Sequence, residues 1–385
     1  MKILIVHNEY QYRGGEDAVV QAEAELLRSY GHQVRFLKRT YGEVIQRGVT
    51  AAIDAVWSRE TTRDVATLKT SWRPDVIHAH NTFPLISPSL FWAADEASIP
   101  IIQTLHNFRL ICPQAMFLRN GRICEECSGH IPWRAALYRC YRGSATQSGV
   151  LASALTIHRA LGTYKSKVTR YIALNDFCRR KFVDGGLPAD AVRIKPNFVA
   201  TPQMTTSMER RGGLFVARLS PEKGLEVLAR AAAKFEANPV AVVGAGPLEY
   251  FTTSTFGSNY LGPKTTQDVL RLMQRSSYLV VPSLWYENFP RTIVEAFSCG
   301  LPVIASRLGA LPEIVKDGRT GLLFEPGSSE DLASKIGWAE QNPGRVRAMG
   351  EAAMEEYLAK YTPAKNYEIL SDIYAEAINT HSTRM

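Results

Sequence analysis

The chain has 385 residues, of which 45% are hydrophobic and 21% are charged, values typical of a folded globular protein rather than a disordered or fibrous one. This length exceeds that of one ordinary hydrophobic core and suits two α/β domains. The formal net charge of +8 is modest, and the sequence contains no recognition helix or stacking motif, so a nucleic-acid-binding protein is not expected. No apolar run approaches the roughly 20 residues of a membrane-spanning helix, so an integral membrane protein is not expected either.

The N-terminal half alternates short apolar runs with helical patterns. The helical period is clearest over Asp17–Tyr30, where Gly31 supplies a stop signal. The start of the chain is too short, and too soon followed by Glu9, to be a signal peptide, so we expect a cytoplasmic protein with reduced cysteines. Strands are predicted at Lys2–Val6, Gln33–Leu37, Val76–Ala79, Ile101–Leu105 and Tyr171–Leu174. This alternation predicts a parallel, doubly wound sheet.

Two adjacent glycines, Gly14 and Gly15, lie between the first predicted strand and the first helix. Glycine lets the backbone approach an anion where a Cβ atom would block it. A tight turn would explain the pair equally well, so the residues alone leave phosphate binding and turn formation open.

Four of the six cysteines follow in a single segment with the spacing Cys-x11-Cys-x2-Cys-x12-Cys, namely Cys112, Cys124, Cys127 and Cys140. One close pair with two flanking cysteines suits a tetrahedral thiolate site, and zinc is the metal expected there. All four positions are filled by cysteine, so the zinc would be structural and would pin an insertion of about residues 108–145. Four reduced thiols without metal are the alternative. Cys178 and Cys299 are expected to be ordinary buried residues.

Basic residues dominate the next stretch, because no acidic residue lies between Glu126 and Asp176. The basic residues there are Arg134, Arg139, Arg142, Arg159, Lys165, Lys167 and Arg170, and the aromatic residues Trp133, Tyr138 and Tyr141 lie among the first of them. This composition suits an anionic membrane surface or a diphosphate-linked acceptor. A solvated basic face is an equally good explanation. We regard Trp133, Arg134 and Arg139 as weak acceptor-site candidates.

A second alternation begins after the segment Ile194–Val199, which we expect to cross between domains. Its predicted strands are Gly213–Ala217, Val240–Val243, Tyr260–Leu261, Tyr278–Val281, Val303–Ala305 and Leu322–Phe324. The tail Tyr361–Ile378 has a helical pattern. The chain therefore divides into an N-terminal domain, 1–198, a C-terminal domain, 199–360, and a closing helical segment, 361–385.

Two basic residues follow the first strand of the C-terminal half. Arg218 leaves the end of that strand, and Lys223 precedes a helix that begins near Gly224. A diphosphate leaving group requires fixed positive charge as negative charge builds on it, and this pair is placed to supply it. A surface salt-bridge pair is the alternative.

Glu287 and Glu295 lie eight positions apart, where the predicted strand Tyr278–Val281 leads into a helix opened by Pro290. A strand that feeds a helix N-terminus forms a crevice suited to phosphate-bearing ligands. A carboxylate cannot hold phosphate, so each glutamate is expected to accept hydrogen bonds from sugar hydroxyls. An exposed loop glutamate and a surface helix glutamate are the alternative.

The segment from Pro282 to Gly327 resembles the retaining glycosyltransferases of family 4, in which Glu287 and Glu295 match the Glu-x7-Glu signature. The resemblance implies the GT-B fold, an α/β fold of two Rossmann-like domains with doubly wound parallel sheets that face a cleft, and a C-terminal helix that crosses back to the first domain. Most members of the family lack the four cysteines, so that insertion belongs to a subset.

The resemblance also implies roles for individual residues. Glu287 would lie beside the donor sugar, Glu295 would bind the ribose, and Arg218 and Lys223 would hold the diphosphate. His106, at the end of the strand Ile101–Leu105, would position a donor or acceptor hydroxyl. The remaining expected donor contacts are Gly14, Gly15, Gly244, Gly262, Asn288, Phe289 and Pro290, and the weaker acceptor candidates include His80 and Asn81. His78 is expected to be structural.

The implied function is transfer of a hexose-type sugar from a UDP- or GDP-sugar to a sugar or lipid-linked acceptor, with retention of anomeric configuration, in surface polysaccharide or glycolipid assembly. Gly244-Ala-Gly246 lacks the third glycine of a dinucleotide fingerprint, and no Asp-x-Asp pair ends a strand, so we expect neither NAD nor a catalytic metal. Peripheral contact with the inner membrane face is compatible with this function. The alternatives are a GT-B sugar-nucleotide epimerase and a zinc-stabilised binding scaffold on an inactive fold.

Overall fold

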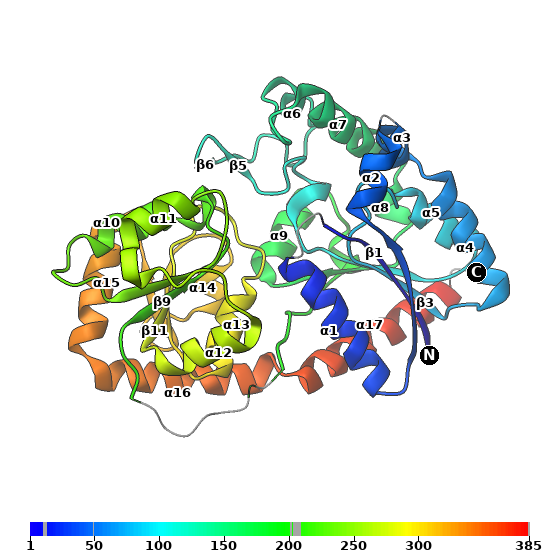
Figure 1. The fold of residues 1–385 in the computed structure, drawn as a ribbon. Coiled ribbons are helices and arrows are strands. Elements are labelled where there is room, and N and C mark those ends of the chain that lie inside the picture. Colours follow the sequence, from blue (N-terminus) through cyan, green and yellow to red (C-terminus); the bar gives the residue numbers. More distant parts are fainter. Residues whose placement is uncertain (11–13, 49, 201, 203–208, 384–385) are drawn as a thin grey trace. The chain divides into compact units, whose positions relative to one another are not determined.

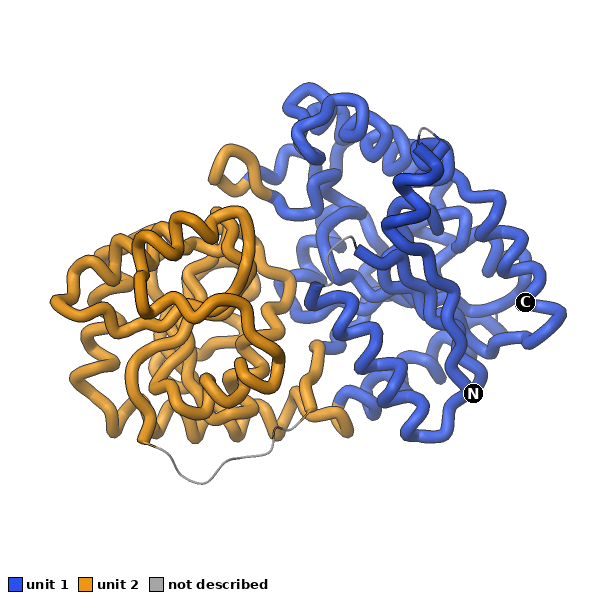
Figure 2. The backbone as a smooth tube through the Cα atoms, viewed as in Figure 1, with its two compact units in different colours: residues 1–117, 124–196, 366–385 blue, residues 118–123, 197–365 orange. Residues whose placement is uncertain are grey.

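The computed structural model describes residues 1–10, 14–48, 50–200, 202 and 209–383. The chain forms two compact units (Figure 2). Unit 1 consists of residues 1–117, 124–196 and 366–385, and unit 2 consists of residues 118–123 and 197–365. The long C-terminal helix α17 (Pro363–Ser382) therefore begins in unit 2 and belongs to unit 1 from Asn366 onwards.

Unit 1 is built on a six-stranded parallel sheet with the order β2-β1-β3-β4-β7-β8. Figure 1 labels its strands β1 and β3. Its strands are β1 (Lys2–Asn8), β2 (Gln33–Arg39), β3 (Val76–Ala79), β4 (Ile101–Thr104), β7 (Arg170–Ala173) and β8 (Val192–Ile194). The four apolar residues Ile3 to Val6 of β1 are completely buried, as expected for a parallel strand covered on both faces.

The helices of unit 1 pack partly on this sheet and partly on one another. They are α1 (Gly15–Ser29), α2 (Tyr41–Arg47), α3 (Thr50–Val56), α4 (Arg59–Ser71), α5 (Ser89–Glu96), α6 (Arg134–Leu137), α7 (Ala145–Ala160), α8 (Thr163–Ser166), α9 (Asp176–Asp184) and α17, with the 3-10 turns η1 (Phe108–Leu110) and η2 (Ala189–Ala191). Gly31 follows α1 with a φ of +82°, which confirms it as the predicted stop. Side chains of α17, including Leu370 and Tyr374, pack with Ile3 and Ile5 in one buried cluster. The closing helix is thus part of the first unit's core.

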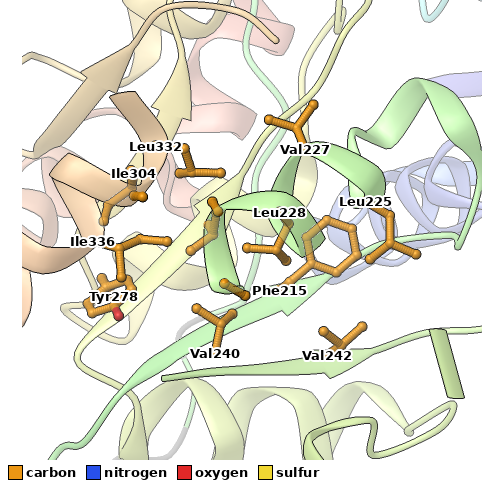
Figure 3. Close-up of a cluster of buried hydrophobic side chains, with 14 of the residues drawn as sticks. Phe215, Leu225, Val227, Leu228, Val240, Val242, Tyr278, Ile304, Leu332 and Ile336 are labelled. Carbon is orange, nitrogen blue, oxygen red and sulfur yellow. The ribbon is translucent and has the colours of Figure 1, made fainter. Parts of the chain in front are cut away.

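Unit 2 contains a five-stranded parallel sheet with the order β10-β9-β11-β12-β13. The strands are β9 (Gly213–Val216), β10 (Val240–Val243), β11 (Tyr278–Val281), β12 (Val303–Ser306) and β13 (Gly321–Phe324). Its helices are α10 (Leu225–Ala232), α11 (Glu249–Phe256), α12 (Thr266–Arg275), α13 (Arg291–Ser298), α14 (Leu311–Ile314), α15 (Ser329–Gln341) and α16 (Pro343–Lys360), with the 3-10 turns η3 (Pro221–Lys223) and η4 (Gly257–Asn259). Figure 3 shows side chains of the buried cluster that α10 and α15 form with this sheet.

The two parallel sheets confirm the predicted α/β architecture, while one predicted strand is wrong and one strand was missed. The expected strand Tyr260–Leu261 is reduced to an isolated bridge between Val242 and Tyr260. The three-residue strand β8 was not predicted, because Arg193 at its centre interrupts the apolar run that marks the other strands. The cysteine segment also forms a small antiparallel hairpin, β5 (Leu118–Arg119) and β6 (Arg122–Ile123).

Among the described residues, no helix is both long enough and apolar enough to cross a membrane.

Candidate functional site

Glu287 lies on the loop after β11 in unit 2 and is only 5% exposed. Its Oε1 atom accepts hydrogen bonds from Lys223 Nζ at 2.7 Å, Ser283 Oγ at 2.7 Å and Trp285 Nε1 at 2.9 Å. The Lys223 ammonium also lies 4.9 Å from the centre of the Trp285 ring. The fold therefore joins two predicted site residues, Lys223 and Glu287, into a single polar cluster. Sequence reasoning missed Ser283 and Trp285, although both lie within four residues of Glu287.

Glu295 lies in the second turn of α13 and is 9% exposed. Its Oε1 atom is 3.0 Å from Arg291 Nε. Burial raises the pKa of Glu295, and the neighbouring Arg291 partly opposes that shift. Glu287 and Glu295 are thus both buried, and the alternative of two surface glutamates is wrong. Pro290 is the N-cap residue of α13, one position before the helix that it was expected to open.

The other predicted residues of this loop are also enclosed. Asn288 is 7% exposed and Phe289 is 9% exposed. The Phe289 ring meets the Tyr361 ring edge to face, with 5.8 Å between centroids. The loop from Glu287 to Pro290 is therefore held by packing before any ligand arrives.

Arg218 lies just beyond β9 and is exposed. Within the described part of the chain, its guanidinium makes no hydrogen bond or ion pair. The backbone on either side is held by a glycine loop, because Ala217 N donates to Val243 O and Leu219 N donates to Ala245 O. Arg218 is therefore a free positive charge on a fixed backbone.

Gly244 belongs to that glycine loop. It has a φ of +149°, and a Cβ atom there would lie 1.9 Å from the Ala217 carbonyl oxygen. Gly244 N donates to Gly262 O, and Gly262 itself has a φ of +71°, with open space where a Cβ atom would stand. Gly244 thus has a clear packing role beside the Arg218 backbone, whether or not it also contacts a ligand.

Gly224 provides a sharp test of the local geometry between Lys223 and α10. It has a φ of +74°, and an added Cβ atom would lie 1.8 Å from the Pro282 carbonyl oxygen. Gly318 has nearly the same φ, +75°, but open space around it. We expect Gly318→Ala to cost about 1–2 kcal/mol from the left-handed backbone alone, and Gly224→Ala to cost about 1–3 kcal/mol more because the loops must separate. Thermal unfolding of the two variants measures the difference, and equal losses would contradict this account.

Gly14 and Gly15 lie at the N-terminus of α1 in unit 1. Gly14 is the N-cap residue of α1 and has extended backbone, and among the described residues a Cβ atom on either glycine would meet nothing within 4 Å. Glycine is a favoured N-cap residue, so the described backbone shows no strained turn here and the contact with a ligand stays a prediction. The Gly14 N–H is not free, however, because it donates to Asp17 Oδ2 at 2.9 Å.

His106 and His80 follow the adjacent strands β4 and β3 of unit 1. Their rings are stacked, with 5.2 Å between centroids, and His80 Nδ1 is 2.8 Å from His106 Nε2. His80 is buried and His106 is partly exposed. Burial lowers the pKa of His106 to about 3 and holds the pKa of His80 well below its ordinary range. Both rings are therefore neutral near pH 7.

Asn81 serves the loop around it. Its Nδ2 donates to Asn8 O at 2.8 Å, and its Oδ1 accepts from Phe83 N at 3.1 Å. His78, expected to be structural, is completely buried and lies within hydrogen-bond distance of Thr104 and Tyr374. Asn81 therefore has a structural role in addition to any contact with an acceptor.

A second polar cluster, missed by the sequence analysis, lies next to His106. Glu16 Oε2 accepts from Tyr10 OH at 2.9 Å, and Asn107 Nδ2 donates to Tyr10 OH at 3.1 Å. Burial raises the pKa of Glu16. In the sequence, Glu16 directly follows Gly15 and Asn107 directly follows His106. This adjacency to predicted site residues is the only sequence signal that would have pointed to them.

The four clustered cysteines all lie in unit 1, and none of them is joined in a disulfide. Burial raises the pKa of Cys127 to about 11, and the nearby Cys112, Cys140 and Cys124 sulfurs add to the effect. Burial also raises the pKa of Cys112, while backbone N–H groups of four following residues, Phe117, Gln114, Ala115 and Met116, oppose the rise by hydrogen bonding to its sulfur. The fold thus gathers the thiols and surrounds one sulfur with amide donors. Cys178 and Cys299 are buried, as predicted.

The weak acceptor candidates lie on and beside α6. Trp133 is 58% exposed, and Arg134 and Arg139 are also exposed. The Arg134 guanidinium lies 5.6 Å from the Trp133 ring centre. Across the described residues, no hydrogen bond or ring contact joins these three side chains to His80, Asn81 or His106.

Within the described ranges, one group of three side chains brings potential metal-ligand atoms within 4.8 Å of one another: Glu23, His78 and His80. All three are buried. The four cysteine sulfurs, which also belong to the described residues, do not meet that criterion, so bound zinc would have to draw them closer together.

Two family models match successive parts of the chain. Residues 14–197 match the model described as "Glycosyl transferase 4-like domain", and residues 205–356 match the model described as "Glycosyl transferases group 1".

Curated relatives are similar over part of their length. An uncharacterized glycosyltransferase of Methanocaldococcus jannaschii is 36% identical over 173 residues, which cover 42% of this chain and 48% of the relative. A D-inositol 3-phosphate glycosyltransferase of Mycobacterium marinum is 25% identical over 319 residues, 79% of this chain and 64% of the relative. The chain thus spans between about half and two thirds of the length of these relatives.

Solved structures are similar in fold over nearly the whole chain. Sucrose-phosphate synthase of Thermosynechococcus elongatus has a TM-score of 0.72 and 16% identity, covering 98% of this chain and 99% of its own. The Anabaena protein HepE, crystallised with UDP, has a TM-score of 0.67 and 19% identity, covering 97% and 99%. At these identities the likeness concerns the fold.

Proposed function

Because this chain joins a glycosyl transferase 4-like domain to a group 1 glycosyl transferase domain and has the GT-B fold, we propose that it transfers a sugar from a nucleotide-diphosphate donor to an acceptor hydroxyl. One observation carries the proposal more than any other. Unit 2 holds the buried Glu287–Lys223 pair at 2.7 Å, in the same unit as Arg218, an exposed positive charge without a partner in the described chain. A diphosphate leaving group requires such fixed charge.

In this proposal, different residues of unit 2 bind different parts of the donor. Arg218 and Lys223 hold the diphosphate and offset the negative charge that develops on it as the glycosidic bond breaks. Glu295 accepts hydrogen bonds from the ribose. Glu287 orients the donor sugar. Its Oε1 accepts from three donors, and its Oε2 makes no hydrogen bond to another described residue, so it can accept from a sugar hydroxyl.

His106, in unit 1, is proposed to contact a sugar hydroxyl. Its low pKa favours hydrogen bonding as a neutral ring over proton donation as an imidazolium. We propose retention of anomeric configuration, with the departing phosphate oxygen taking the acceptor's proton. The acceptor would be a sugar or lipid-linked intermediate of surface polysaccharide or glycolipid assembly.

Thermal unfolding with a panel of UDP, GDP, ADP and NAD, with and without EDTA, tests donor binding. A ligand at a hundred times its dissociation constant adds about 2.7 kcal/mol of stability. The complexes of HepE with UDP and UDP-glucose make UDP the expected ligand here. A selective shift with one diphosphate, lost in Arg218→Ala, supports the transferase. No shift with any diphosphate favours a binding scaffold, and formation of an epimeric sugar nucleotide without free nucleotide favours an epimerase.

We also propose that Cys112, Cys124, Cys127 and Cys140 hold a structural zinc ion. The donor set suits zinc, and backbone N–H groups around the Cys112 sulfur would stabilise its thiolate form. The ion would fix the loops between η1 and α7, where the hairpin β5–β6 and the four-residue α6 offer little core of their own.

The zinc proposal predicts one zinc per chain by elemental analysis. Cys124→Ser/Cys127→Ser is expected to lose the metal and lower the unfolding temperature, because metal-binding free energy contributes to folding. The control is Cys178→Ala, a buried cysteine of the same unit, which should keep the metal. A metal-free chain whose stability is unchanged by added zinc would contradict the proposal.

Finally, we propose that the segment around α6 contacts an anionic membrane surface. Its exposed apolar residues, Ile131 at 65%, Trp133 at 58%, Leu137 at 63% and Tyr138 at 47%, lie among arginines without an acidic residue from 127 to 175.

The membrane proposal predicts co-sedimentation with vesicles of phosphatidylglycerol and weaker binding to phosphatidylcholine. Trp133→Ser/Leu137→Ser should reduce binding at least about tenfold, because each buried apolar side chain contributes about 1.5–3 kcal/mol. The matched control is Ile45→Ser on α2, where the side chain is 68% exposed. Equal losses in both variants would exclude a specific contact at α6.

A further inference from the structure

A line of buried polar side chains leads inward from His106 in unit 1. His106 Nε2 is 2.8 Å from His80 Nδ1, and His80 Nε2 is 3.5 Å from Glu23 Oε1. The other oxygen of Glu23 accepts from Lys195 Nζ at 2.7 Å. Glu23 comes from α1 and Lys195 follows β8, while His80 and His106 follow β3 and β4, so four separate elements build the line.

The charges along this line are fixed by burial and pairing. The Glu23 and Lys195 side chains are each 1% exposed. Burial alone would raise the pKa of Glu23, but the Lys195 ammonium and His78 hold it well below its ordinary range. His80 and His106 are neutral, as described above. The line therefore contains one carboxylate, one ammonium and two neutral imidazoles, and each imidazole has one N–H and one bare nitrogen.

The carboxylate decides which nitrogen of His80 carries the proton. Glu23 Oε1 only accepts hydrogen bonds, and Nε2 is the His80 nitrogen that faces it. At 3.5 Å this contact is electrostatic and not a hydrogen bond, and neither atom has a hydrogen-bond partner among the described residues. A bare His80 Nε2 would still direct its lone pair at a buried carboxylate oxygen, so the N–H lies on Nε2. His80 Nδ1 is then an acceptor, and His106 Nε2–H must donate to it.

We infer that Glu23, acting through His80, holds His106 in the tautomer whose bare Nδ1 accepts a hydrogen bond from a sugar hydroxyl. The inference rests on the proposed function for the presence of that hydroxyl, but the tautomer itself does not depend on it. Within the described chain, His106 Nδ1 has no hydrogen-bond partner and the residue is partly exposed. Glu23 and His80 are thus positioning residues that touch no substrate.

Lys195 and His78 support this arrangement. Lys195 keeps Glu23 ionised, and Nδ1 of His78 lies 3.0 Å from Glu23 Oε1 and 2.7 Å from the Tyr374 hydroxyl. A metal ion held by Glu23, His78 and His80 is the competing explanation. It is disfavoured because the ion would add positive charge beside the Lys195 ammonium, and because His78 already has partners at both nitrogens.

The experiment is ¹⁵N NMR of histidine-labelled full-length chain, with His106 assigned by its loss in His106→Gln. The parent protein should show His106 as the single Nε2–H tautomer. Glu23→Leu/Lys195→Met removes both charges together and is expected to fold, because an apolar pair can replace a buried ion pair without loss. In this variant His106 should become a mixture of tautomers.

Kinetics supply the second readout. In the double variant, kcat/KM should fall about 10–100-fold, the usual scale for a residue that orients a functional group. Binding of the nucleotide diphosphate by unit 2 should be unchanged. The matched control is Arg47→Gln/Asp54→Asn, which removes a 2.8 Å ion pair elsewhere in unit 1 and should alter neither readout.

Two results would overturn the inference: an Nδ1–H His106 in the parent chain, or an unchanged His106 tautomer in the double variant. A shift of the parent's His78 and His80 signals on adding EDTA would replace it with a metal site. A parent chain that shows the Nε2–H tautomer but transfers no sugar would instead contradict the proposed function. The inference that Glu23 and His80 set the His106 tautomer would still hold.

Discussion

An Arg218→Ala variant is expected to turn over about 10²–10³ times more slowly than the parent chain, the usual scale for one donor that stabilises transition-state charge. Arg218 is exposed on a backbone held by Gly244 and has no partner in the described structure, so its removal leaves no unpaired protein charge and should not destabilise the fold. The measurement is the initial rate of sugar transfer at saturating donor, together with an unfolding curve of the same preparation.

Two matched variants sharpen this result. Arg230→Ala on α10 removes an equal charge from an exposed position of the same unit and should keep the parent rate. Arg218→Lys retains charge without the planar guanidinium and should recover part of the rate. If Arg218→Ala transferred sugar at the parent rate, Arg218 would have no role at the diphosphate.

Replacing Lys195 alone by methionine is expected to cost about 3–5 kcal/mol of stability, because it leaves the Glu23 carboxylate buried without a counter-charge. Lys195 also donates to Asn366 Oδ1 at 3.3 Å, and Asn366 Nδ2 donates to Pro196 O at 2.7 Å, so the loss extends to the end of β8 and the start of α17. The lowered midpoint of unit 1 should appear in differential scanning calorimetry.

The companion variant is Glu23→Leu/Lys195→Met, which should recover most of the lost stability. Recovery would show that the cost of Lys195→Met comes from the uncompensated charge rather than from the lost volume of the lysine side chain. A double variant as unstable as the single one would mean that packing around Lys195, not its charge, stabilises this region.

The local sequence pattern was sufficient to predict a strand wherever at least four successive residues are apolar. Ile3 to Val6 and Tyr278–Val281 were predicted as strands because a parallel strand buried on both faces requires an unbroken apolar run, and both are buried in the structure. The strand β8 was not predicted because it has only three residues and its central arginine interrupts the apolar run that marks a buried strand. A strand was wrongly predicted at Tyr260–Leu261 because an aromatic residue beside leucine is typical of strands. Only one bridge forms there, between Val242 and Tyr260.

The candidate site was likewise only partly visible in the sequence. The spacing of Glu287 and Glu295 was visible in the sequence because both glutamates belong to one strand–loop–helix unit. Their burial was not visible, and neither was the choice of Lys223, 64 residues away, as the partner of Glu287. Such pairing depends on which loops meet at the end of a sheet, and no local preference records it.

The sequence by itself therefore determined the two parallel α/β units, the glutamate pair, the basic pair and the cysteine segment, because each is written in residues close together along the chain. Only the tertiary structure decided that Glu23 pairs with Lys195, 172 positions away, beneath the histidines that follow β3 and β4. A glutamate in an amphipathic helix and a lysine after a short strand look solvent-exposed in isolation. They become a buried ion pair because the doubly wound sheet brings α1, β8 and α17 around the same core, where each charge is stable only in the presence of the other.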